Sequence, residues 1–162
     1  MIINPLAIPI SALIVLLIGF IWYNPKVFGT IWMRENGFTT EMLRKGNMLK
    51  IFGFTYIFAL MLTMTLMSLT VHQSGAIGMV GGPALAENAK PSFAAFMADY
   101  GDAFRTFKHG ALHGCLTGLF FALPIIGING LFERKSWKYI FVHAGFWTIT
   151  LTIIGAILCG WK

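Results

Sequence analysis

Charged residues are scarce in this sequence, and acidic residues are scarcest. Only 11% of its 162 residues are Asp, Glu, Lys or Arg, against about 25% in ordinary soluble domains. Four long stretches, 1–25, 51–86, 109–132 and 139–161, contain no charged side chain. Each includes an apolar segment of at least about 18 residues, which is enough to cross a bilayer as a helix. This absence excludes a soluble globular domain.

The common catalytic motifs are also missing. The sequence has no Gly-x-Ser-x-Gly, no phosphate-binding glycine loop and no His-Glu-x-x-His. Its two cysteines, Cys115 and Cys159, do not have metal-site spacing, and we interpret them as small buried residues, with a disulfide as the alternative. No acidic residue is predicted at the bilayer centre. We therefore expect no cofactor, and a non-enzyme rather than an enzyme.

The apolar segments predict an all-α fold, because a chain in lipid must satisfy its backbone groups within each helix. Spans are expected at about 5–23, 51–71, 110–131 and 139–160, in a single membrane domain covering 1–162. The short turn 133–138 forces the third and fourth helices into an antiparallel hairpin. The prediction is an integral membrane four-helix bundle of two antiparallel hairpins, with short interfacial amphipathic helices.

The positive charge is distributed unevenly, although the net charge is +6. Basic residues gather between the first two spans and between the last two: Lys26, Arg34, Arg44, Lys45, Lys50, Arg134, Lys135 and Lys138. By the positive-inside rule these loops face the cytoplasm, so both termini lie outside a bacterial inner membrane. The basic residues are expected to meet anionic lipid headgroups, and no nucleic-acid partner is expected.

Capping residues predict shorter helices around the spans. Asn24-Pro25 is a typical helix start, and Gly37 a typical helix end, for an amphipathic helix over 25–36. A second helix should start at Thr39-Thr40-Glu41 and run without a break into the second span. In the third span, Pro124 should produce a kink.

The loop 72–108 divides into two parts. Its first part, 72–89, is rich in Gly and Ala and is predicted to be irregular. Its second part carries aromatic and Met residues at helical spacing: Phe93, Phe96, Met97, Tyr100, Phe104 and Phe107. We expect an interfacial helix leading into the third span, with a partner-binding helix as the alternative.

Small residues recur every four positions in the third span, at Gly110, Gly114, Gly118 and Ala122. Such a groove lets another backbone approach closely, which is a main source of packing energy in lipid. The partner could be the fourth helix or another copy of the protein.

Beside this groove runs a polar stripe of His109, His113 and Thr117. Two histidines four residues apart could share one metal ion, although a metal site needs further ligands. Candidates for a third ligand are His72, Glu87, Asp99 and Asp102. Interhelical hydrogen bonding is the favoured interpretation, and proton handling, solute contact and metal binding remain open.

A second polar cluster is predicted at the cytoplasmic end. Asn129, Glu133 and His143 could line a cavity there, although Glu133 could equally be a solvated turn residue. Aromatic side chains at this depth are expected to act as interfacial anchors, namely Trp22, Tyr23, Trp32, Trp137 and Trp147.

Two stretches resemble a known family. One is Gly19-Phe-Ile-Trp-Tyr-Asn-Pro25 with Phe28-Gly29 and Trp32-Met33; the other is 129–138 with His143-Ala-Gly-Phe-Trp147 and 155–157. They are similar to the signatures of the bacterial membrane family called domain of unknown function 1761. The long outer loop with 107–114 looks like a Bacteroidota-type elaboration. The resemblance implies a four-helix inner-membrane protein and supplies no activity or site residues.

We expect the protein to act through assembly, as a homo-oligomer or an accessory subunit of a membrane-protein partner. The contacts would be the third-helix groove and the outer aromatic helix. An oligomeric transporter or channel, with one polar cluster lining the route, is the alternative. A membrane enzyme or metal-dependent protein is a third possibility.

Overall fold

The structure is a computed structural model that describes residues 4–162, and this part of the chain is all-α, with no strand. The helices are α1 (Ala7–Trp22), the π-helical turn η1 (Pro25–Gly29), α2 (Thr30–Asn36), α3 (Thr40–Arg44), α4 (Met48–Thr70), α5 (His72–Met79), α6 (Pro83–Ala86), α7 (Pro91–Tyr100), α8 (Phe107–Thr117), the π-helical turn η2 (Gly118–Ala122), α9 (Leu123–Phe132) and α10 (Trp137–Gly160).

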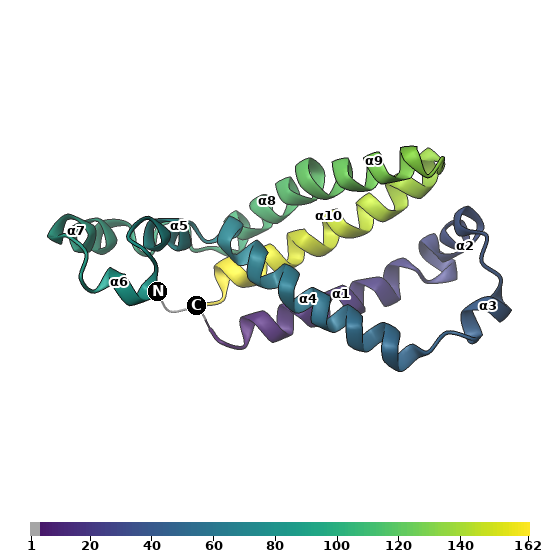
Figure 1. Cartoon of the computed structure of the whole chain (residues 1–162), viewed down its shortest axis with the longest axis horizontal. Coiled ribbons are helices and arrows are strands. Elements are labelled where there is room, and N and C mark those ends of the chain that lie inside the picture. Colours follow the sequence, from purple (N-terminus) through teal and green to yellow (C-terminus); the bar gives the residue numbers. More distant parts are fainter. Residues whose placement is uncertain (1–3) are drawn as a thin grey trace.

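The long helices form two antiparallel hairpins, as predicted (Figure 1). One hairpin is α1 with α4, and the other is the continuous stretch α8–η2–α9 with α10. Helix α10 packs against α1, α4 and α8, so it is the central helix of the bundle. We call the end where α1 begins and α10 ends the terminal end, and the opposite end the turn end.

Three helical stretches, Met48–Thr70, Phe107–Phe132 and Trp137–Gly160, are long and apolar enough to cross a membrane. A fourth is available if Ala7–Trp22 and Pro25–Asn36, which meet at 54°, are taken as one bent span. The chain thus has the helices of a multi-pass membrane protein, and we treat it as one below.

The bundle interior is closely packed around α10. Leu66, Ile154 and Leu158 are at most 1% exposed, and the small residues Ala7 and Ala12 let α1 approach closely. Three hydroxyl side chains, from Ser11, Thr63 and Thr150, are fully buried and make no side-chain hydrogen bond within the described residues. The core is therefore mainly apolar, with isolated hydroxyls on three different helices.

The predicted continuous helix from Thr39 into the second span is wrong. Thr39 does cap α3, because its hydroxyl accepts a hydrogen bond from the Met42 N–H, but α3 ends at Arg44. A new helix, α4, then begins after Asn47, whose side chain accepts from the Lys50 N–H. The capping asparagine therefore starts a new helix at this point, even though the helical periodicity of the sequence continues across it.

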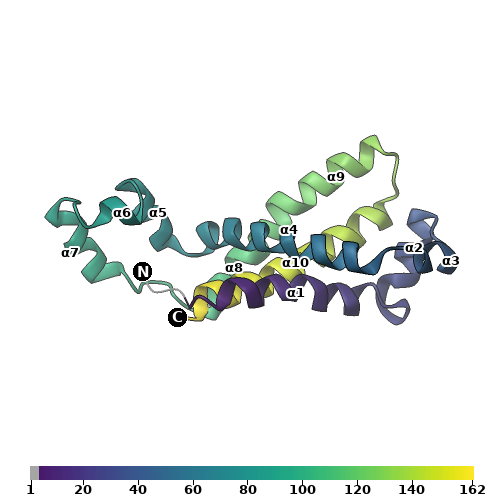
Figure 2. The same cartoon turned by 60° about the horizontal axis from the view of Figure 1, so that its bottom comes forward.

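The projecting segment, which we define as residues 72–106, extends beyond the terminal end of the bundle (Figure 2). Its first part is helical, not irregular as predicted, because α5 and α6 occupy it. The Gln73 amide donates hydrogen bonds to the carbonyls of Tyr100 and Ala103, which ties α5 to the end of α7. This long-range contact offsets the low helix propensity of the local glycines.

The aromatic pattern across 93–107 does not form one helix. Helix α7 ends at Tyr100, Phe104 adopts a left-handed backbone conformation with φ of 61°, and Thr106 caps α8 by accepting from the His109 N–H. Aromatic spacing persists through this break, which is why periodicity alone joined the two helices.

The effect of Pro124 takes the form of a π-helical turn. Proline lacks an N–H and its ring collides with the preceding turn of an ordinary helix. The chain absorbs this by η2, just before the proline, where the Leu123 N–H bonds to the Gly118 carbonyl. The helical stretch Phe107–Phe132 therefore continues across the proline.

Candidate functional site

Three histidines meet at the terminal end of the bundle. His109 and His113 lie one turn apart on α8, and His72 comes from the start of α5. The Nε2 atoms of His72 and His109 are 2.8 Å apart, and the His113 ring centroid lies 4.9 Å from that of His72. One nitrogen from each of the three rings lies within 4.8 Å of the others. We call these residues the histidine cluster.

The surroundings of the histidine cluster are aromatic and partly enclosed. The Phe104 ring lies 5.0 Å from the His109 ring and meets the His72 ring edge-on. His72 also lines a cavity of about 300 Å³ between α5 and α7, together with Gln73, Ala76, Phe96, Met97, Tyr100, Ala103 and Phe104. Thr117 is not part of the cluster, because its hydroxyl donates to the His113 carbonyl within α8.

The small-residue groove of the third span faces α10. A methyl group added at Gly110 would overlap the Gly155 carbonyl oxygen, and one added at Gly114 would overlap the Leu151 carbonyl. Gly118 is equally close to Thr148, and Ala122 packs against the apolar core. The groove is therefore filled by the same chain and offers no free surface to a second copy.

At the turn end, no hydrogen bond or ion pair joins the predicted trio of Asn129, Glu133 and His143 within the described residues. Asn129 and Glu133 are exposed at the end of α9. His143 instead meets two tyrosines: its Nδ1 lies 3.1 Å from the Tyr23 hydroxyl, and its ring lies 4.3 Å from the Tyr139 ring. The Nε2 atom of His143 is buried without a partner in the described residues.

The aromatic residues predicted as anchors mostly make internal contacts. The Trp22 indole N–H donates to the Val142 carbonyl, and its ring covers Gly145. Trp32 packs against Tyr23, and Trp147 lies ten residues into α10, near the middle of the helix, where it packs on the core. Only Trp137 of the four tryptophans stays mostly exposed, at 61%.

These contacts join the two stretches that carry the family resemblance. Trp22 and Tyr23 come from the first stretch, and His143 and Gly145 from the second. Beside them, an apolar cavity of about 460 Å³ is lined by Trp22, Phe28, Ile31, Trp137, Lys138, Phe141, Val142 and Gly145. The two stretches that carry the family resemblance thus determine how the bend after α1 packs against α10.

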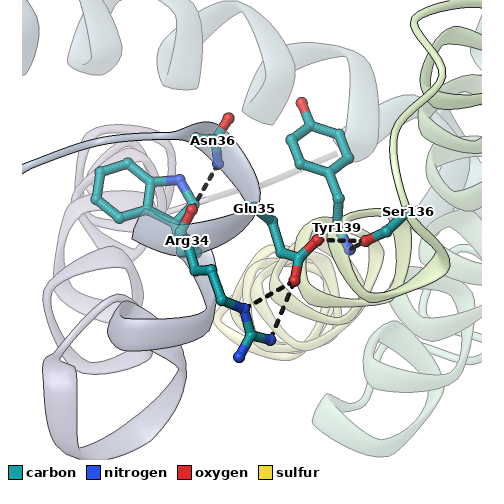
Figure 3. A network of polar contacts seen from close by, with 6 residues as sticks. Arg34, Glu35, Asn36, Ser136 and Tyr139 are labelled. Carbon is teal, nitrogen blue, oxygen red and sulfur yellow. Dashed lines mark hydrogen bonds and ion pairs between the residues drawn. The ribbon is translucent and has the colours of Figure 1, made fainter.

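A carboxylate links α2 to the turn before α10 (Figure 3). Glu35 accepts hydrogen bonds from the Arg34 guanidinium and from the Ser136 hydroxyl. Ser136 also caps α10 by accepting from the Tyr139 N–H. The Ser136 hydrogen bond, together with Arg34, lowers the pKa of Glu35. Sequence reasoning missed this contact, although Ser136 before an apolar run is a readable helix-start signal.

We expect the stability of the protein to depend on pH through Glu35. Because its pKa is below the ordinary value of 4.5, its contribution is present above that pH and is lost as pH falls through the folded-state pKa. Glu35→Gln should lower the unfolding temperature in detergent at neutral pH, and the gap to the parent should close in acid. The matched control is Glu41→Gln on α3, whose side chain is exposed. A pH-independent gap would contradict the prediction.

The histidine cluster is the part of the site for which the structure adds most to the sequence analysis. The stripe of His109 and His113 was readable from their spacing, and His72 was one of four candidates for a third ligand. The structure selects His72, because Val71 separates α4 from α5 and the His72 side chain, at the start of α5, reaches His109 on α8. No local sequence signal distinguished His72 from the acidic candidates.

Comparison with known proteins gives one match. Searches of curated proteins and of solved structures found nothing similar to this chain. The model of a family described as "Protein of unknown function (DUF1761)" matches residues 6–159, which covers the four long helical stretches except for Gly160. The Bacteroidota origin stays a prediction. The chain, whose helices are those of a multi-pass membrane protein, therefore belongs to the DUF1761 family of proteins of unknown function.

Proposed function

We propose that this protein acts by association in the membrane, as a homo-oligomer or as an accessory subunit. The observation that supports this is the closely packed bundle interior around Leu66, Ile154 and Leu158. Both cavities described above lie at the ends of the bundle, so they do not join across it. Neither of these two cavities reaches the middle of α10, which favours association over a solute path through one copy.

The contact surface proposed for association is the exposed aromatic face of α7. Phe96 is 48% exposed and Tyr100 is 56% exposed, with their rings 5.2 Å apart. Helix α7 does not pack closely on any helix of the bundle, because the projecting segment contacts the bundle through α5, at α4, and through Arg105, at α10. Because the glycine groove is already filled by α10, α7 is the remaining candidate of the two predicted contact surfaces.

The test is the number of chains in each particle. We expect chemical cross-linking in native membranes, and light scattering during size exclusion in mild detergent, to show more than one copy of the parent. The double variant Phe96→Ser, Tyr100→Ser should reduce the particle to one copy, because burying these rings would supply the apolar contact energy. The matched control is Ile128→Ser, Phe132→Ser on α9, which removes two exposed apolar side chains at the turn end.

The outcomes separate the two forms of the proposal. Cross-links to a different membrane protein, lost in the α7 variant, would support the accessory-subunit form. A parent that cross-links to nothing and elutes as one copy would contradict both forms. Equal effects of the α7 and α9 variants would show that the contact is not specific to α7.

A further inference from the structure

We propose that His72, His109 and His113 bind one transition-metal ion of the Zn²⁺ class. This inference goes beyond association and does not depend on it. It starts from a juxtaposition: two rings from one face of α8 and a third ring from α5, 37 residues away from His109 in the chain, converge at one point.

The spacing of the nitrogens suits a shared ion. Imidazole nitrogens bind Zn²⁺ at about 2.0–2.1 Å, so two of them on one tetrahedral ion lie roughly 3.4 Å apart. In the histidine cluster the His72–His109 pair is at 2.8 Å, and all three nitrogens fall within 4.8 Å. These separations bracket the required value. Rotations of the three side chains would therefore bring the nitrogens toward the separation that a shared ion requires.

Hydrogen bonding alone does not account for all three rings. The contact between His72 and His109 could be a simple imidazole pair. The His113 ring, however, makes no hydrogen bond within the described residues, although it lies 4.5 Å from the His109 ring. A polar ring inside a membrane helix normally has a partner. A metal ion would give His113 the same partner as the other two histidines.

The ligand set points to a particular class of ion. All three donors are imidazoles, which suit zinc, copper and nickel, whereas calcium and magnesium require oxygen ligands. Three protein ligands leave a tetrahedral ion with one further position. His72 also lines the cavity of about 300 Å³ between α5 and α7, so a water or a small donor molecule could reach the ion from there.

Metal binding would also connect the projecting segment to the bundle. His72 is the first residue of α5, while His109 and His113 belong to the third span. One ion held by all three would cross-link these two parts of the chain. We therefore expect the ion to stabilise the arrangement of the projecting segment as well as to occupy a site.

The experiment uses the full chain purified in detergent without a histidine tag, stripped with a chelator and then exposed to Zn²⁺. After desalting, elemental analysis should give about one zinc per chain, and Zn²⁺ should raise the unfolding temperature. His113→Ala should weaken zinc affinity by at least about 100-fold and abolish the thermal shift. The matched control is His143→Ala, because His143 lies at the turn end in α10.

A second measurement keeps the test independent of folding defects. His72→Ala changes an exposed side chain in the projecting segment, so it should fold like the parent and still lose zinc. In the parent, Zn²⁺ should slow cleavage by a glutamate-specific protease after the exposed Glu87, and in His72→Ala it should not. Less than about 0.1 zinc per chain in the parent would overturn the proposal. Equal zinc binding by the parent and His72→Ala would also overturn it.

Discussion

Replacing Gly114 with Leu should prevent the bundle from forming. At Gly114 the α8 backbone contacts the α10 backbone at Leu151, so even one added methyl group overlaps a carbonyl oxygen. Backbone cannot move aside as a flexible side chain can, and we expect a cost above about 3 kcal/mol. The measurement is the yield of monodisperse protein in mild detergent, together with its unfolding temperature. Gly114→Ala should give a smaller loss in the same direction.

The control for this prediction lies in the same helical stretch. Gly127 on α9 has no heavy atom within 4 Å of the position that a Cβ would take. Gly127→Leu should therefore leave yield and unfolding temperature near those of the parent. Gly127→Ala should stabilise α9 by up to about 1 kcal/mol, because alanine is the better helix former. A normal yield for Gly114→Leu would contradict the close contact between α8 and α10.

Replacing Arg105 with Met should lower stability by about 1.5–3 kcal/mol, which is the usual range for a hydrogen bond to a charged group. Arg105 is only 6% exposed, and its Nε donates to the Cys159 carbonyl at the end of α10. A positive charge there also favours the negative end of the helix dipole. Methionine keeps most of the side-chain length, so the change mainly removes the polar contact.

Thermal unfolding in detergent measures this loss. The control is Lys108→Met, which removes one positive charge from an exposed position on α8. We expect the control to change stability little, because exposed charges contribute little on their own. If Arg105→Met and Lys108→Met unfold at the same temperature, the contact with α10 does not contribute to stability.

The fold was largely predictable because lipid imposes simple rules. The lack of charge located the long helices, and the short turn 133–138 set the second hairpin. Gly37 ends α2 with φ of 68°, and Asn24 caps η1, as their residue types predicted. Such signals act through local chemistry, so one sequence is enough to read them.

The rest of the site depends on contacts between distant residues. Neither the partner of Gly114 nor the neighbours of His143 could be derived from spacing, since both depend on how α10 seats in the bundle. The helix at His72–Met79 was missed because the partner that stabilises it, the Ala103 carbonyl bonded by Gln73, lies outside the segment. Aromatic periodicity also hid the break at Phe104, where the backbone conformation is left-handed.

The central place of α10 has a consequence for biogenesis. Helix α10 follows its neighbours α1, α4 and α8 in the chain, so it leaves the ribosome after all of them. Until it arrives, the bare glycine surface of α8 must rest against lipid or against the insertion machinery. Helices α1 and α4 can pair as soon as both are inserted, whereas α8 can pair only after α10 has been synthesised.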